Sequence, residues 1–329
     1  MLVAMVLLNP AAANPPTTYL AFLEDHLIEE ATVTGKGKRE PYEPAVRVAF
    51  RKSGNEWSSI CDPRAFVRTP VKSCDYKDFK KTRLWQGLDS SNNELTAKTV
   101  GLRDPVAYSE VGLLKTLSPT LLDSGTDRQI LFGGHNFWAV RKPLALVSGK
   151  YSKSDPEGWS EVDLRADVVP TFLQEFVQRE FSVLKKCEPE FPSRTQKIQG
   201  ELRMDLRGEG LRLRRQYRSQ SRLELWQIEI PAVAIKLCGS EHTGRDWNEP
   251  HALKVWVFRD KNADFGMILS LRAKENFGAF DKYELIEHRD FDGDGSTEVI
   301  FWYSGYVHDG YVLLSDGLTK LTTFTWGYH

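Results

Sequence analysis

Nine residues near the C-terminal end of the chain, with the sequence DFDGDGSTE, carry acidic side chains at alternate positions. Asp290, Asp292 and Asp294 fill positions 1, 3 and 5, and Glu298 fills position 9. Calcium binds about six to eight oxygen atoms at about 2.3–2.6 Å, and a tight loop turns carboxylates at alternate positions toward one ion. Glycine at position 6 permits the sharp turn, and the backbone carbonyl of Ser296 at position 7 supplies a neutral oxygen. The spacing therefore predicts a calcium site with Asp290, Asp292, Asp294, Ser296 and Glu298 as ligands.

The segment differs from an EF-hand. That loop needs a bidentate glutamate at position 12, where this chain has Phe301, and it lies between helices, whereas residues 283–288 and 299–304 have the pattern of strands. Residues 283–310 hold seven acidic side chains and one basic one, Arg289, and neighbouring aspartates repel each other without a cation. The alternative is a solvated acidic turn, which the spacing disfavours. We expect a structural ion that pins the hairpin rather than a catalytic one.

The pattern D-x-D-x-D-G-x-x-[D/E] between two predicted strands resembles the calcium loop of FG-GAP/VCBS repeats, which occur in integrin-α-type propeller blades and in many exported bacterial proteins. The resemblance covers residues 283–314 and implies that Asp290, Asp292, Asp294 and Glu298, with the Ser296 carbonyl, hold the ion. The chain has one clear loop of this kind and no Phe-Gly…Gly-Ala-Pro text. The resemblance is therefore to the loop and not to a full propeller. The closing segments also resemble the ends of exported bacterial proteins, which implies no activity.

Composition excludes several classes of protein. The chain has 329 residues, of which 41% are hydrophobic, enough for a sizeable core and too many for general disorder. No uncharged apolar run reaches about 18 residues, so no segment is predicted to cross a membrane as a helix. The 44 basic and 45 acidic side chains remove the argument for a globally basic nucleic-acid binder. Residues 201–222 carry seven arginines against three acids, but arginine is common on the solvent-facing side of strands, so nucleic acid is not an expected partner.

The first residues have the layout of a secretory signal peptide. Leu2–Leu8 form an apolar run, Asn9-Pro10 breaks it, and Ala11–Ala13 supply a cleavage site of small residues. No Lys or Arg precedes the run, so either the true start lies upstream or the apolar end is coincidental. The signal-peptide interpretation predicts that residues 1–13 are removed and that the mature protein is periplasmic or secreted.

Four cysteines agree with an oxidising compartment. Of the three ways to pair them, we favour Cys61–Cys74, which closes a short loop, together with Cys187–Cys238. The chain has no Cys-x-x-Cys, which argues against a thioredoxin-type redox site or a zinc knuckle. Four free thiols in a cytosolic protein are the alternative.

We predict an α+β fold that is rich in strands, with an N-terminal β-rich region over residues 14–150. Short apolar runs between turn residues predict strands there, such as residues 46–50 before Gly54-Asn55. Residues 19–31 form a mixed segment that suggests a helix.

Residues 151–329 are predicted to form a helix plus an antiparallel β domain that carries the calcium loop. Leu173, Phe176 and Val177 begin an apolar stripe at helical spacing, which indicates one amphipathic helix packed on the core. Strands of period two follow with short connections, including an expected tight turn at residues 308–310. This pattern predicts an antiparallel meander in the C-terminal half.

No residue is assigned to catalysis or to an organic cofactor, because the chain lacks G-x-S-x-G, H-E-x-x-H and P-loop motifs. We expect an exported, non-enzymatic binding or envelope protein whose unknown partner is a protein or a glycan. The alternative is a secreted or periplasmic hydrolase with scattered active-site residues. Converging carboxylates or histidines in a pocket would favour the enzyme, and an exposed aromatic patch would favour the binder.

Overall fold

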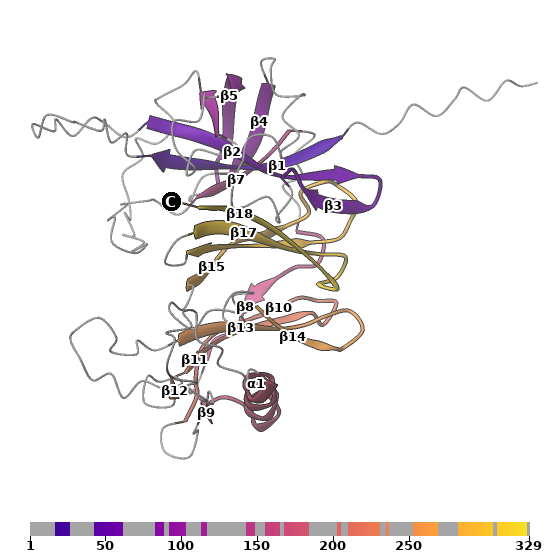
Figure 1. The fold of residues 1–329 in the computed structure, drawn as a ribbon. Coiled ribbons are helices and arrows are strands. Elements are labelled where there is room, and N and C mark those ends of the chain that lie inside the picture. The colour runs from indigo at the N-terminus through magenta and orange to yellow at the C-terminus, as the bar shows by residue number, and fades with distance from the viewer. Residues whose placement is uncertain are drawn as a thin grey trace, which may run out of the picture.

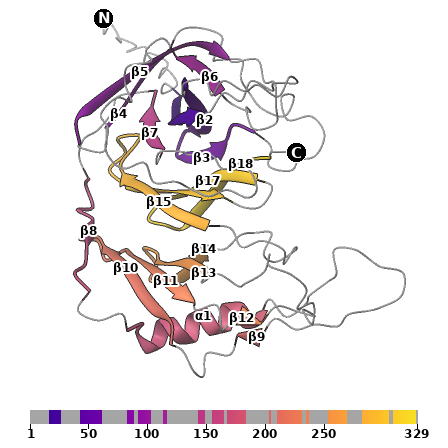
Figure 2. The same cartoon turned by 90° about the vertical axis from the view of Figure 1, so that its left-hand side faces the viewer.

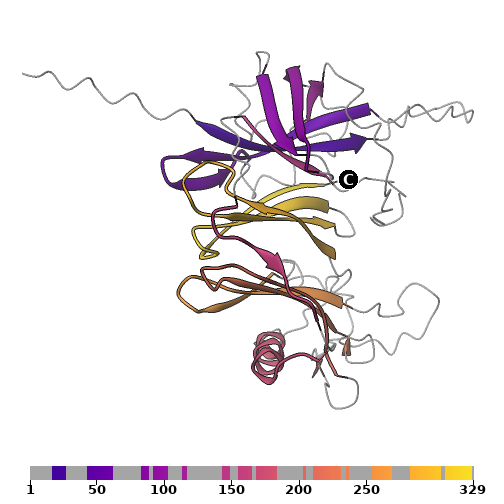
Figure 3. The same ribbon diagram turned by 180° about the vertical axis from the view of Figure 1, so that it is seen from behind.

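Sheets of seven, four and five strands lie one on another in that order, and a helix lies outermost on the five-stranded sheet (Figures 1 and 3). The computed structural model describes residues 17–26, 43–61, 83–88, 92–102, 113–116, 143–148, 155–164, 168–183, 203–204, 210–230, 235–236, 253–268, 282–304 and 308–327. The strand-rich, antiparallel architecture predicted from the sequence is confirmed, and the described strands do not form a propeller.

The seven-stranded sheet is built from the N-terminal part of the chain. Its strands are β1 (Thr18–His26), β2 (Glu43–Ser53), β3 (Glu56–Ser59), β4 (Arg83–Leu88), β5 (Glu94–Leu102), β6 (Leu113–Thr116) and β7 (Leu144–Val147). All pairings are antiparallel, in the order β1-β7-β4-β5-β6-β2-β3. β1 also pairs with β2, from Thr18 opposite Lys52 to His26 opposite Glu43. β1 therefore has two strand partners, β7 and β2.

The five-stranded sheet follows in the chain. It consists of β8 (Ser160–Glu161), β10 (Arg212–Arg218), β11 (Glu224–Ile230), β13 (Leu253–Arg259) and β14 (Phe265–Ile268), in the order β14-β13-β11-β10-β8. A separate two-stranded ladder joins β9 (Arg203–Met204) to β12 (Ile235–Lys236). Part of the arginine-rich segment forms β10, where the side chain of Arg214 pairs with Glu229 at 2.7 Å and that of Arg218 with Glu224 at 2.7 Å. Neighbouring carboxylates therefore offset part of its local charge.

Helix α1 (Thr171–Val183) packs on the outer side of the five-stranded sheet (Figure 2). The carbonyl of Pro170 accepts the amide of Gln174 at 3.1 Å, an i to i+4 hydrogen bond at the start of the helix. Leu173, Phe176 and Val177 are buried, so the predicted amphipathic stripe faces the core. Across the described residues, no helix is long and apolar enough to span a membrane.

The four-stranded sheet is the predicted C-terminal meander. Its strands β15 (Lys282–Arg289), β16 (Glu298–Ser304), β17 (His308–Ser315) and β18 (Lys320–Gly327) pair in chain order, each antiparallel to the next. Short connections permit this order, because antiparallel neighbours need only a turn between them.

This meander is the middle layer, and its two faces belong to two different cores. In β16, Ile300 and Trp302 pack into the core of the seven-stranded sheet, whereas Val299, Phe301 and Tyr303 pack into the core of the five-stranded sheet. β17 alternates in the same way. Successive side chains of a strand point to opposite faces, so one apolar strand serves both cores.

Two local predictions are wrong. The segment expected to be helical at residues 19–31 forms β1 over its described part, because pairing with β2 and β7 and burial on both faces outweigh local propensity.

The turn expected at residues 308–310 is also wrong, because these residues form the start of β17. A Cβ on Gly310 would lie 2.3 Å from the carbonyl oxygen of Phe324 and 2.3 Å from the ring of Tyr303. Glycine is therefore needed there for close packing, not for a turn.

Several predictions concern residues outside the described part of the chain. The signal peptide at residues 1–13 lies there, as do Cys74, Cys187 and Cys238. Cys61 is buried just after β3 and is disulfide-bonded. The pairing Cys61–Cys74 and the pairing Cys187–Cys238 stay predictions.

A buried polar network joins the seven-stranded sheet to the meander. The Nε of Arg47 donates to both carboxylate oxygens of Glu24, at 2.8 and 3.0 Å, and the hydroxyl of Tyr311 donates to Glu24 Oε1 at 2.5 Å. All three residues are at most 4% exposed. Burial and the charge of Glu24 raise the pKa of Tyr311 well above its usual range, so the phenol remains a donor. The ring of Tyr311 also stacks on Phe22, 3.5 Å between centroids.

We expect Arg47→Met to destabilise the protein by about 3–5 kcal/mol, because it leaves the Glu24 carboxylate buried without its guanidinium partner. The double variant Glu24→Gln with Arg47→Met should lose less, because its amide oxygen still accepts from Tyr311 and no charge is buried. Urea unfolding followed by tryptophan fluorescence measures both losses. A double variant that is no more stable than Arg47→Met would contradict this account of the network.

Candidate metal centre

The acidic loop connects β15 to β16, and Asp290 holds its shape. Asp290 Oδ1 accepts the amides of Gly293 at 2.7 Å and Asp294 at 3.1 Å, and its Oδ2 accepts the amide of Gly295 at 3.0 Å. The residue is only 4% exposed. Hydrogen bonds to an ionised acceptor are stronger than neutral ones, so this buried carboxylate organises the turn.

The residues between the aspartates give the loop its curvature and its anchor. Gly293 and Gly295 have φ angles of +77° and +89°, in the left-handed region that glycine enters without steric cost. Position 6 therefore needs glycine, as predicted. Phe291 is fully buried in the core shared with the seven-stranded sheet. Its burial fixes the loop against that sheet.

Three carboxylates converge on one side of the loop. One oxygen each from Asp290, Asp292 and Asp294 lies within 4.8 Å of the others. Asp292 Oδ1 accepts the amide of Asp294 at 3.0 Å, and Asp294 Oδ1 accepts the amide of Ser296 at 2.8 Å. These two aspartates thus use one oxygen to fold the loop and direct the other, Oδ2, to a partner outside the loop. The three form a group that could hold a metal ion.

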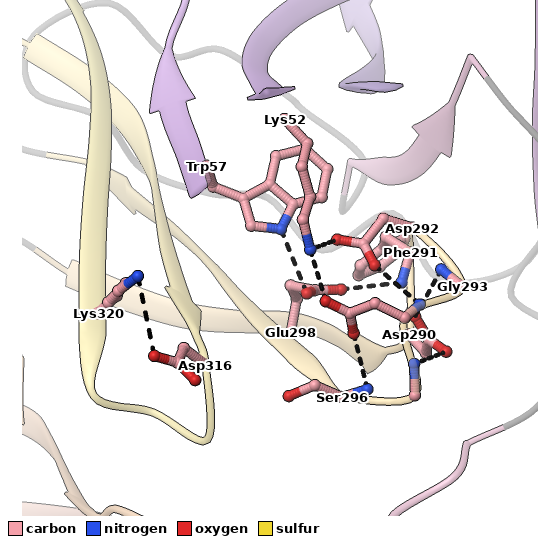
Figure 4. A network of polar contacts seen from close by, with 12 residues as sticks. Lys52, Trp57, Asp290, Phe291, Asp292, Gly293, Ser296, Glu298, Asp316 and Lys320 are labelled. Carbon is pink, nitrogen blue, oxygen red and sulfur yellow. Dashed lines mark hydrogen bonds and ion pairs between the residues drawn. The ribbon is translucent and has the colours of Figure 1, made fainter. Parts of the chain in front are cut away.

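Lys52, near the end of β2, reaches this group from the seven-stranded sheet (Figure 4). Its Nζ donates to Oδ2 of Asp292 and to Oδ2 of Asp294, the latter at 2.6 Å. The side chain of Lys52 is 10% exposed and that of Asp292 is 4% exposed. Burial lowers the pKa of Lys52, but the hydrogen bonds and charges of the two aspartates outweigh it, so the net pKa is raised. The ammonium group is held charged beside both carboxylates.

Glu298, the predicted ligand at position 9, is satisfied by other partners. Its Oε1 accepts the indole N–H of Trp57 at 3.2 Å, and its Oε2 accepts the amide of Phe291 at 2.9 Å. Burial raises the pKa of Glu298 well above its usual range, and the charge of Asp292 adds to the rise. Glu298 lies outside the group of three converging carboxylates. Its role as a ligand, like that of the Ser296 carbonyl, stays a prediction.

Lys52 and Trp57 are the site residues that sequence reasoning missed. They precede the loop by about 240 positions and carry no motif of their own. The turn at Gly54-Asn55 between two apolar runs predicts a hairpin that sets Lys52 opposite Trp57, and the structure has this pair. Only the packing of the sheets shows that the hairpin faces the acidic loop.

A second polar group adjoins the loop. Asp155 Oδ1 accepts the hydroxyl of Thr297 at 3.3 Å, and its Oδ2 lies 3.8 Å from Nδ1 of His288. Glu157 accepts the indole N–H of Trp159 at 3.2 Å. Burial raises the pKa of Glu157. The hydrogen bond from Trp159 lowers this pKa, but by less than burial raises it. Two carboxylates and an imidazole thus gather where the five-stranded sheet meets the meander.

Comparison of the chain with protein-family models, with curated proteins and with solved structures finds no match.

We predict that Asp290→Ala destabilises the protein far more than Asp294→Ala when both are measured in EDTA. Loss of three buried, charge-assisted amide contacts should cost at least about 3 kcal/mol. The side chain of Asp294 is 44% exposed, so loss of its pairing with Lys52 and of its exposed contact with the Ser296 amide should cost only about 1 kcal/mol. Urea unfolding of the two variants beside the wild type measures the difference. Equal losses would show that Asp290 does not organise the loop.

Proposed function

We propose that the chain is an exported, non-enzymatic binding or envelope protein whose Asp290–Glu298 loop binds calcium as a structural ion. The observation that carries the calcium proposal is the convergence of Asp290, Asp292 and Asp294 within 4.8 Å. Carboxylate oxygens are the ligands that calcium prefers, and the D-x-D-x-D-G spacing resembles that of FG-GAP/VCBS calcium loops. Ser296 and Glu298 complete the proposed ligand set.

The place of the loop supports a structural role for the ion. The loop follows directly on a strand of the middle sheet, its Phe291 is buried in one core, and its Thr297 bonds Asp155 on the side of the other sheet. An ion that fixes this loop would stabilise the contact of the meander with both neighbouring sheets. Calcium is abundant outside cells, so mass action would favour the bound, folded state there.

Exposed aromatic side chains support the binding role. Phe172 and Phe265 are 48% and 37% exposed, and their ring centroids lie 5.6 Å apart, against the buried Trp226 and Phe176 on the helix side of the five-stranded sheet. Aromatic faces of this kind suit a protein or a glycan partner.

The alternative function, a secreted or periplasmic hydrolase, is favoured by the group of Asp155, Glu157 and His288. Burial raises the pKa of the Glu157 carboxyl, and the neighbouring Asp155 carboxylate lies 3.8 Å from Nδ1 of His288. Such a group of carboxyls and an imidazole can serve general acid–base catalysis. Turnover of chromogenic ester or glycoside substrates that Glu157→Gln abolishes would decide for the hydrolase. The same substrates left intact by the wild type would decide for the binder.

We expect calcium to raise the unfolding temperature of the wild type relative to EDTA, by the equivalent of about 2.7 kcal/mol at a hundredfold excess over Kd. The double variant Asp292→Ala with Asp294→Ala should abolish this difference, because it removes two ligands. Asp316→Ala, in the β17–β18 turn and outside the acidic loop, is the matched control and should keep it. Differential scanning calorimetry measures all three proteins. Equal unfolding temperatures for the wild type in calcium and EDTA would reject the calcium site.

Export has a separate test. The signal-peptide interpretation predicts that protein recovered from its native host begins near Asn14, because residues 1–13 have been cleaved. N-terminal sequencing of the envelope and secreted fractions measures this directly. A cytosolic protein that retains Met1 would contradict export without affecting the calcium proposal.

A further inference from the structure

We propose that Lys52 is a tethered cation that occupies the calcium position of the loop, so that calcium binding displaces its ammonium group. The inference rests on the calcium site proposed above and adds the regulation of that site. Its consequence is that the charge contact between hairpin β2–β3 and the loop depends on calcium.

Lys52 contacts the oxygen atoms that a bound ion would need. Asp292 and Asp294 each use Oδ1 to accept a loop amide, from Asp294 and Ser296 respectively. Their Oδ2 atoms are the ones free to bind an ion. Lys52 Nζ contacts both Oδ2 atoms. The ammonium therefore uses the same oxygens that the proposed calcium ion needs.

The ammonium group of Lys52 also lies as close to an aspartate oxygen as a calcium ion would. Nζ lies 2.6 Å from Asp294 Oδ2. Calcium binds oxygen at about 2.3–2.6 Å, so an ion that bridges the two Oδ2 atoms would occupy the space of the ammonium group. Two cations side by side on one pair of carboxylates would also repel each other. Occupancy by Lys52 and by calcium is thus mutually exclusive.

The β2–β3 hairpin directs Lys52 toward the acidic loop. Lys52 and Trp57 are directly opposed in the β2–β3 register, so their side chains leave the same face of the hairpin. Trp57 donates to Glu298 at one end of the loop while Lys52 reaches the aspartates at the other (Figure 4). Departure of Lys52 would leave the hairpin attached through Trp57 and free its charged end. Calcium binding would then replace the contact of Lys52 between two sheets with an ion bound inside the loop.

Substitution of Lys52 by an uncharged residue tests the competition. We expect Lys52→Met, in the full chain, to bind calcium at least about tenfold more tightly than the wild type by isothermal titration calorimetry, because no ammonium must be displaced. Lys52→Gln serves as a second uncharged variant if methionine impairs folding. Lys320→Met is the matched control, since Lys320 pairs with Asp316 and Glu56 on the surface nearby. It should bind calcium like the wild type.

A measurement on the wild type makes the test independent of any variant. Acetic anhydride modifies free amines, and mass spectrometry quantifies the modification of each lysine. Calcium should increase the rate of acetylation at Lys52, whose side chain is 10% exposed in its ion pairs, and leave the rate at Lys320 unchanged. An unchanged or slower rate at Lys52 in protein that binds calcium would overturn the displacement.

The outcomes separate this inference from the calcium proposal. Equal calcium affinity of wild type and Lys52→Met overturns the competition and leaves the calcium site standing. Binding by Lys52→Met alone supports the competition and shows that the wild-type loop is held by lysine instead of calcium. Binding by neither protein overturns both.

Discussion

The fold depends on a four-stranded meander whose central strands, β16 and β17, are buried on both faces. β15–β18 lie between the seven-stranded and five-stranded sheets, and successive residues of β16, such as Ile300 and Phe301, enter opposite cores. A half-exposed strand alternates apolar and polar residues, whereas a strand between two cores must be apolar throughout. The run Val299–Tyr303 meets that demand. Without this layer, each neighbouring sheet would expose one face of its core.

Burial on both faces makes polar contacts between layers consequential. The polar groups of Glu24, Arg47 and Tyr311 bond to one another between the seven-stranded sheet and the meander, where an unpaired buried group would destabilise the fold. The acidic loop lies at the edge of the same interface, with Phe291 inside the core and Asp294 at the surface. Its aspartates can therefore reach both a lysine of the neighbouring sheet and an ion from solvent. This position makes the loop suited to couple cation binding to the packing of layers.

Sequence reasoning predicted the elements whose signals are local. The stripe of Leu173, Phe176 and Val177 is sufficient to place α1, and period-two runs with short links place the meander. It failed for β1, because a segment such as Tyr19–Leu23, buried on both faces, has no alternation to show. It also failed at residues 308–310, where Gly310 serves the approach of Tyr303 and the neighbouring strand rather than a turn.

Some features of the acidic loop likewise follow from local sequence, and others follow only from tertiary structure. The sequence by itself determined the turn, the glycine at position 6 and the convergence of three aspartates, because hydrogen bonds from loop amides to aspartate carboxylates within nine residues create them. Only the tertiary structure decided which cation lies beside them and where Glu298 directs its oxygens. Lys52 and Trp57 arrive from a hairpin about 240 residues away, and no local pattern records contacts made by the packing of separate sheets.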